Sequence, residues 1–188
     1  MEGAEKGSEG RAGRAERGRP PLDREALERL ATSYVGRYAT TRARLVQYLT
    51  RKLRERGWDG EAPPDLPALA QRFADAGWLD DRAWGEARVR GLVGRGYGPR
   101  RAGEALARAG VGGEDAAPGR ALAKDGAWAA ALRLAERRGI GPYAAARPDA
   151  KGRERWMAQL VRAGHDFRTA RTLADAAPGE VPSDPDER

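Results

Sequence analysis

The chain has 188 residues, of which 40% are hydrophobic and 34% charged, and its formal net charge is +7. This length fits one or two compact domains or an extended array of small helical modules, and an apolar fraction rich in alanine predicts thin cores. The absence of cysteine excludes disulfides and thiolate metal sites, and no run approaches the ~18 apolar residues of a membrane span. The first residues lack the apolar stretch of a signal peptide, so a cytoplasmic location is expected.

The positive charge is concentrated between the two ends of the chain. Met1–Pro21 has a net charge of +1 and Pro178–Arg188 one of −3, which leaves +9 for the body. Such a body favours polyanions or an acidic protein surface, although arginine is also a good helix former. Both end segments are rich in glycine or proline and in charge, so residues 1–21 and 178–188 are expected to be disordered tails.

Between the tails the pattern predicts helices and no sheet, because the body has a single isoleucine, few valines and no alternating stretch. A first helix should follow the cap residue Asp23. A second should follow Thr40–Thr41 and stop at Gly57, and a third should open at Pro63–Asp65 and stop at Gly77.

The next helices carry residues that disfavour helix. A fourth helix should begin at Asp80–Asp81 and turn Trp84, Ala87, Gly91 and Leu92 inward. Further along, Pro118–Gly119 falls where another helix is expected, so that helix should be short, broken or begun at Pro118. The glycines in this part of the chain weaken their helices further; they are Gly85, Gly91 and Gly103.

An internal repeat suggests the overall organisation. Leu53–Gly57, Leu106–Gly110 and Leu160–Gly164 each run from a leucine to a glycine at a predicted helix end, and their glycines are 53 and 54 residues apart. This spacing fits three short helices and their connections, in modules too small to stand alone. The predicted three-helix modules are residues 22–78, 79–124 and 125–177.

No catalytic or metal-binding constellation is recognisable. The sole histidine, His165, follows a helix-ending glycine, which indicates a surface or capping role. The pairs Asp80–Asp81 and Glu114–Asp115 stand at predicted helix starts, where carboxylates act as caps. No nucleophile and base can be paired, so the chain is expected not to be an enzyme and to need neither cofactor nor metal.

The segment Gly94–Arg101 resembles a phosphate-binding loop only superficially. Pro99 stands where the dinucleotide pattern requires glycine, the Lys-Ser/Thr ending of a P-loop is missing, and no strand precedes it. A helix stop, a glycine turn and Pro99 in the first turn of the next helix explain the glycines. These turn and helix preferences do not explain why four arginines surround the turn with Tyr97 among them. Such a set of side chains suits the binding of carboxylates or phosphates.

Several motifs together resemble the RecX family. They are Gly77–Trp84 (GWLDDRAW), Arg95–Arg101 (RGYGPRR) and the Leu106–Gly110 helix end. Arg37–Leu45 with Arg54–Asp59 resembles the family's first module, and Arg138–Tyr143 with Ala163–Phe167 resembles the last module of its proteobacterial members. The resemblance covers about residues 23 to 176.

The resemblance implies an all-α, elongated and curved helical repeat protein. It also implies a regulator that binds the groove of RecA filaments on single-stranded DNA and inhibits ATP hydrolysis, strand exchange and filament growth in recombination, DNA repair and the SOS response. The partners are then RecA and single-stranded DNA within the filament, with no membrane and no small-molecule substrate. The candidate partner-binding residues are Arg90, Arg95, Tyr97, Arg100 and Arg101, with Arg153 and Arg155 as secondary candidates.

Two questions stay open at the level of sequence. The alternative function is an autonomous helical nucleic-acid-binding protein, which would bind bare single-stranded DNA tightly and with a steep dependence on salt. For a RecA regulator, capping filament ends, blocking the groove and promoting disassembly are all compatible with the sequence.

Overall fold

The computed structural model describes residues 20–186, and this part of the chain is all-helical. Its only β feature is an isolated parallel bridge between Leu22 and Trp58. The helices are α1 (Arg24–Val35), α2 (Arg42–Arg56), α3 (Leu66–Asp75), α4 (Asp81–Gly94), α5 (Pro99–Arg108), α6 (Gly113–Asp125), α7 (Ala127–Arg138), the 3₁₀ turn η1 (Gly141–Tyr143), α8 (Ala150–Arg162) and α9 (Phe167–Asp175). The all-α prediction is confirmed.

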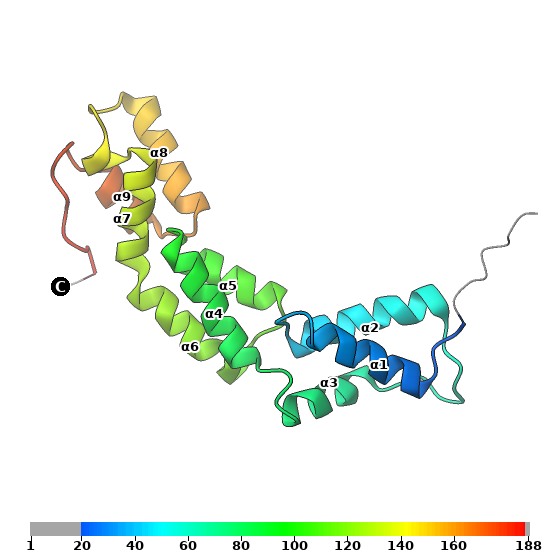
Figure 1. Ribbon diagram of the computed structural model, residues 1–188. Coiled ribbons are helices and arrows are strands. Elements are labelled where there is room, and N and C mark those ends of the chain that lie inside the picture. The colour runs from blue at the N-terminus through cyan, green and yellow to red at the C-terminus, as the bar shows by residue number, and fades with distance from the viewer. Residues whose placement is uncertain (1–19, 187–188) are drawn as a thin grey trace, which may run out of the picture.

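The helices form an elongated, bent molecule, with α1–α3 at one end, α7–α9 at the other and α4–α6 between them (Figure 1). Three hydrophobic clusters follow the same grouping: one contains Leu45, the second Leu106 and the third Leu160. We propose that these clusters are the cores of three modules with approximately the predicted boundaries. Leu79 packs in the first cluster and a single residue, Gly126, separates α6 from α7.

Helix starts follow the local sequence. The side chains of Asp23, Asp65 and Asp80 each accept the backbone N–H three residues later, at 2.7–2.9 Å, and Thr41 does the same at 3.3 Å. Each such bond satisfies a donor that the first turn of a helix leaves unpaired. The caps predicted at Asp23 and Thr41 are confirmed.

The repeated Leu-to-Gly segments are the carboxyl ends of α2, α5 and α8. The carbonyl of each repeated leucine accepts a backbone N–H four or five residues later, at 2.8–3.2 Å. The repeated glycines have φ values of 83°, 72° and 99°, in the left-handed region where a residue with a Cβ atom is strained. The repeat is therefore one helix-ending device used three times.

These three helices also lie end to end. The Thr41 hydroxyl at the start of α2 donates to the Ala109 carbonyl at the end of α5, at 2.6 Å. The N–H of Gly98 at the start of α5 donates to the Ala163 carbonyl at the end of α8, at 3.0 Å. We call the α2–α5 contact the first junction and the α5–α8 contact the second junction.

The prediction for the helix around Pro118 is wrong, because α6 runs unbroken from Gly113 to Asp125. Pro118 is the sixth residue of α6, so its ring removes one hydrogen bond close to the helix start. Gly119 lets α6 approach α4 closely: a Cβ atom there would lie 3.3 Å from the Val89 side chain. Packing against α4 therefore stabilises the helix through its proline.

The predicted inward face of α4 is also partly wrong. The buried residues are Asp81, Gly85, Val89 and Leu92, whereas Ala87 and Gly91 are exposed. Gly85 is a close-packing position, since a Cβ atom there would lie 3.1 Å from Leu106. The hydrophobic periodicity did not predict that Gly85 is buried, because glycine has no apolar side chain by which a buried helix face is recognised.

The tails are described only in part. Residues 1–19 of the predicted amino-terminal tail lie outside the described residues. Residues 178–186 have no helix or strand and return to the third group of helices, where the Gly179 N–H donates to the Pro142 carbonyl at 2.8 Å and Asp186 pairs with Arg168 at 3.1 Å. Within residues 20–186, every helix is too short or too polar to cross a membrane.

Candidate functional site

The arginine-rich turn lies at the second junction. As predicted, α4 stops at Gly94, a glycine turn follows, and Pro99 is the first residue of α5. The turn is tied to the end of α8, because the Arg100 N–H donates to the Gly164 carbonyl at 3.1 Å. A Cβ atom at Gly98 would lie 2.5 Å from the carbonyl carbon of Gly164, so glycine is required for this approach.

Two of the predicted arginines in this turn present free guanidinium groups. Arg95 and Arg101 are exposed, and neither side chain forms an ion pair within the described residues. The Arg101 guanidinium lies 5.8 Å from the centroid of the Tyr97 ring, and Tyr97 packs between the second and third hydrophobic clusters. Tyr97 is therefore a packing residue that also positions Arg101, through a cation–π contact.

The other two arginines near the turn already have partners. Arg100 pairs with Glu104 at 2.6 Å and donates to the Val161 carbonyl at 2.7 Å, across the second junction. Arg90 pairs with Glu86 at 3.3 Å on the exposed side of α4. Exposed i,i+4 pairs contribute only about 0.3–0.5 kcal/mol, so Arg90 can exchange its partner more easily than Arg100 can.

Arg153 and Arg155 lie away from the turn. Both are in the first half of α8, whereas the opposite end of that helix makes the second junction. Arg153 pairs with Asp175 of α9, and hydrogen bonding from Arg153 lowers the pKa of that carboxyl. Arg155 is exposed. The structure thus brings Arg95, Tyr97, Arg100 and Arg101 together, and it places Arg153 and Arg155 on a separate part of the surface.

The structure corrects the role predicted for His165. The side chain is 2% exposed and its Nε2 atom lies 3.1 Å from the Gly96 carbonyl, inside the second junction. Burial lowers the pKa of this imidazole, which favours the neutral form. The neighbouring Asp166 supplies the cap of α9 instead, accepting the Thr169 N–H at 2.8 Å.

A charged cluster at the first junction was missed in the sequence. Asp81 does not cap its own helix α4: it is buried, it accepts the backbone N–H of Arg42 at the start of α2 at 3.0 Å, and it pairs with the Arg42 guanidinium at 3.1 Å. The same guanidinium reaches Asp115 of α6 at 2.5 Å. Hydrogen bonding to Asp81 raises the pKa of Arg42. These residues are 39 and 73 positions apart, so no local pattern could reveal the cluster.

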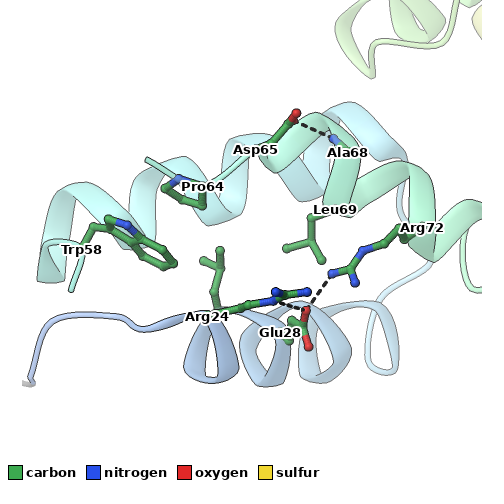
Figure 2. Close-up of a pocket in the computed structure, with 9 residues that line it drawn as sticks. Arg24, Glu28, Trp58, Pro64, Asp65, Ala68, Leu69 and Arg72 are labelled. Atoms are coloured by element: carbon green, nitrogen blue, oxygen red, sulfur yellow. Dashed lines mark hydrogen bonds and ion pairs between the residues drawn. The ribbon is translucent and has the colours of Figure 1, made fainter. Parts of the chain in front are cut away.

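Glu28 and Asp65 line an apolar hollow and have structural roles. The hollow has a volume of about 330 Å³ and is lined by residues that include Leu27. Figure 2 shows it between α1 and α3, with Trp58 and Leu69 among its lining side chains. Arg72 and Arg24 both point to Glu28, at 2.7 and 3.5 Å, and hydrogen bonding from Arg72 lowers the pKa of that carboxyl. A general acid needs a raised pKa, so Glu28 is poorly suited to that role.

The described residues offer no group of three or more potential ligand side chains placed to hold a metal ion. Their arrangement supports binding through guanidinium groups held on helices that contact one another end to end. Such groups recognise carboxylates and phosphates by paired hydrogen bonds.

Comparisons with known proteins point to one family. The chain is 29% identical over 167 residues to "Regulatory protein RecX" of Myxococcus xanthus (strain DK1622), covering 81% of this chain and 86% of the relative. The crystal structure of RecX from Lactobacillus salivarius superposes with a TM-score of 0.56 at 16% identity, covering 79% of this chain and 92% of the other. A second crystal structure, of regulatory protein RecX, superposes with a TM-score of 0.55 at 17% identity. The match covers 80% of this chain and 73% of the other.

No family model matches the chain. The sequence similarity to the Myxococcus protein and the fold shared with two RecX crystal structures nevertheless agree with each other and with the motifs at Gly77–Trp84 and Arg95–Arg101. The chain therefore resembles a regulatory RecX protein in sequence and shares the fold of two RecX crystal structures.

Proposed function

We propose that the chain regulates RecA, by binding in the groove of RecA filaments on single-stranded DNA in the cytoplasm. There it inhibits ATP hydrolysis, strand exchange and filament growth, as a negative regulator of recombination and the SOS response. The observation that carries this proposal is the similarity to regulatory RecX proteins along about four-fifths of the chain.

The shape and charge of the molecule support the same proposal. An elongated row of helices can contact several subunits of a helical polymer at once, and repeated weak contacts then add up. The body carries an excess of positive charge, which complements a filament built around a polyanion. Association with such a partner should weaken as salt is added.

Among the candidate residues, we propose that Arg95 and Arg101 contribute most. Both are exposed and neither forms an ion pair with another residue in the range 20–186, so contact with the filament need not break an ion pair there. Arg90 and Arg155 follow as exposed arginines, and Arg100 and Arg153 contribute less because each already bonds to another part of the chain.

The test is a RecA ATPase assay on single-stranded DNA. The double variant Arg95→Ala/Arg101→Ala should need at least about tenfold more protein for half-inhibition, since each lost charged hydrogen bond costs about 1.5–3 kcal/mol when it is well formed. The matched control is Arg82→Ala/Arg171→Ala, which removes the same charge from two exposed arginines that each form an exposed i,i+4 ion pair. Inhibition that is unchanged in the first variant would contradict the site, and no inhibition by the unaltered protein would contradict the function.

A further inference from the structure

A second surface combines aromatic rings with positive charge, at the opposite end of the molecule from α7–α9. It is a hollow of about 440 Å³ where the end of α1 faces the middle of α2. The residues that line it are Ser33, Tyr34, Arg37, Tyr38, Tyr48, Arg51 and Lys52. We call this surface the tyrosine hollow.

The rings of the tyrosine hollow are ordered from inside to outside. Tyr34 and Tyr48 stack on each other, with centroids 4.2 Å apart and planes at 9°, and both pack against the first hydrophobic cluster. Tyr38 lies 5.4 Å from Tyr34 at an angle of 50°, and it is 58% exposed. The inner rings therefore form a rigid support, and Tyr38 offers an aromatic face to solvent.

The charge around these rings is positive. Arg51 and Lys52 lie 5.6 and 5.9 Å from the Tyr48 ring centroid, and both approach Glu55, at 3.6 and 2.6 Å. Arg37, which precedes Tyr38 in the sequence, is the third cation among the lining residues. Arg51 and Lys52 share Glu55 as a partner, and Arg37 adds a third cation to a lining that contains no acidic side chain. The surface beside the exposed Tyr38 ring therefore carries an excess of positive charge.

We propose that the tyrosine hollow binds single-stranded nucleic acid, with a base stacked on Tyr38 and the neighbouring phosphates at Arg37 and Arg51. Every base has a face that can stack on an aromatic ring, and a cationic groove follows the backbone, so this combination binds single strands with little sequence preference. An acidic peptide would use the cations and leave the ring without a partner. A duplex would keep its bases stacked inside and out of reach of Tyr38.

The proposal does not rest on RecA regulation, because it concerns a strand without a protein coat. Its residues are also distinct from the arginine turn: the tyrosine hollow is built from α1 and α2, and the turn connects α4 and α5. The two surfaces can therefore be altered and measured separately.

The experiment measures fluorescence anisotropy of a labelled oligothymidylate of about 20 nucleotides, without RecA. Tyr38→Ala should weaken binding by about 5- to 100-fold, and Tyr38→Phe should keep it, because stacking needs the ring and not the hydroxyl. The control is Phe167→Ala, which removes an aromatic ring of similar exposure (63%) at the start of α9 and should leave binding unchanged. Because Tyr38 is exposed, the helical circular dichroism of both variants should match that of the unaltered protein.

The charge contribution has its own readout. The double variant Arg37→Ala/Arg51→Ala should reduce the slope of log K against log salt by about 1.4, since each phosphate contact on a single strand contributes about 0.7. The control is again Arg82→Ala/Arg171→Ala, which has the same net charge and should keep the slope.

Competitors distinguish the class of ligand. Unlabelled oligothymidylate should displace the probe at much lower concentration than either inorganic polyphosphate or polyglutamate of equal charge. Equal displacement by polyglutamate would mean that the surface binds acidic proteins and would overturn the proposal. Equal binding by Tyr38→Ala and the unaltered protein, or no binding of the oligonucleotide at all, would overturn it as well.

Discussion

Both junctions join the carboxyl end of one helix to the amino end of another, but different interactions stabilise them. In each, the end of one helix of the row meets the start of the next. The first junction is held by side chains: the Thr41 hydroxyl and the Arg42 guanidinium, the latter shared between Asp81 and Asp115. The second is held by main-chain hydrogen bonds from Gly98 and Arg100 and by the buried His165.

This difference predicts different weaknesses. A junction held by a buried ion pair is sensitive to the loss of a charge, because the remaining partner stays buried without compensation. A junction held by close main-chain contact is sensitive to added volume and to a new charge inside it. The following changes should separate the two.

The largest effect is expected at the first junction. Arg42→Ala leaves the carboxylate of Asp81, whose side chain is 3% exposed, without its cation. Removing one partner of a buried pair costs about 3–5 kcal/mol, and the partial exposure of Arg42 places the expected loss of unfolding free energy near the lower end, about 3 kcal/mol. Urea unfolding followed by circular dichroism measures it.

The control for this variant is Arg82→Ala, which removes an exposed i,i+4 partner of Glu86 and should cost about 0.5 kcal/mol or less. A loss below about 1 kcal/mol in Arg42→Ala would show that the ion pair is not what stabilises the first junction.

A smaller loss is expected at the second junction. In Gly98→Ala the new methyl group meets the Gly164 main chain, which can move only if α5 and α8 separate. Overpacking of this kind costs about 1–3 kcal/mol, so we expect a loss of about 2 kcal/mol and a lower thermal midpoint.

Gly103→Ala provides the matched comparison in the same helix. A Cβ atom at Gly103 has no neighbour within 4 Å, so the change should raise stability by up to about 1 kcal/mol through helix propensity. If Gly98→Ala also raised the thermal midpoint, the close contact between α5 and α8 would be wrong.

The smallest effect depends on pH. Burial lowers the pKa of His165 in the folded protein below its ordinary value near 6.5, so the unfolded chain binds more protons in the interval between the two values. Stability contributed by the neutral imidazole is therefore complete above pH 6.5 and is lost as the pH falls below it, by at most about 1.4 kcal/mol per pH unit.

Unfolding midpoints between pH 7.5 and 5 test this, since Asp and Glu ordinarily titrate below that range. His165→Gln should give a flatter profile than the unaltered protein, because the chain has no other histidine. Identical profiles would show that the junction tolerates the charged ring.

Local chemistry explains why much of the fold was predictable. Caps such as Asp23 and Thr41, and glycine stops such as Gly57, act over three to five residues, so the sequence displays them directly. The helix through Pro118 was mispredicted because its stabilisation comes from α4, which lies more than twenty residues earlier. The tyrosine hollow was missed because Tyr38 lies in the connection after α1, Tyr48 lies within α2, and packing brings them to one surface.

The candidate site shows the same division. The sequence identifies a glycine turn surrounded by arginines, and the structure brings Arg95, Arg100 and Arg101 to one junction. Which guanidinium groups are available to a partner depends on distant contacts, such as Arg100 with the Val161 carbonyl and Arg153 with Asp175. Neither contact can be predicted from the spacing of residues within one helix.

The sequence by itself determined the helical class, most helix ends and the threefold use of a Leu-to-Gly stop, because these depend on backbone preferences and on bonds within one turn. Only the tertiary structure decided that α2, α5 and α8 lie end to end, that Asp81 and His165 are buried, and that Arg95 and Arg101 form no ion pair with the rest of residues 20–186. Those outcomes depend on which groups meet across tens of residues, where burial changes the free energy of a charge far more than its neighbours in sequence do.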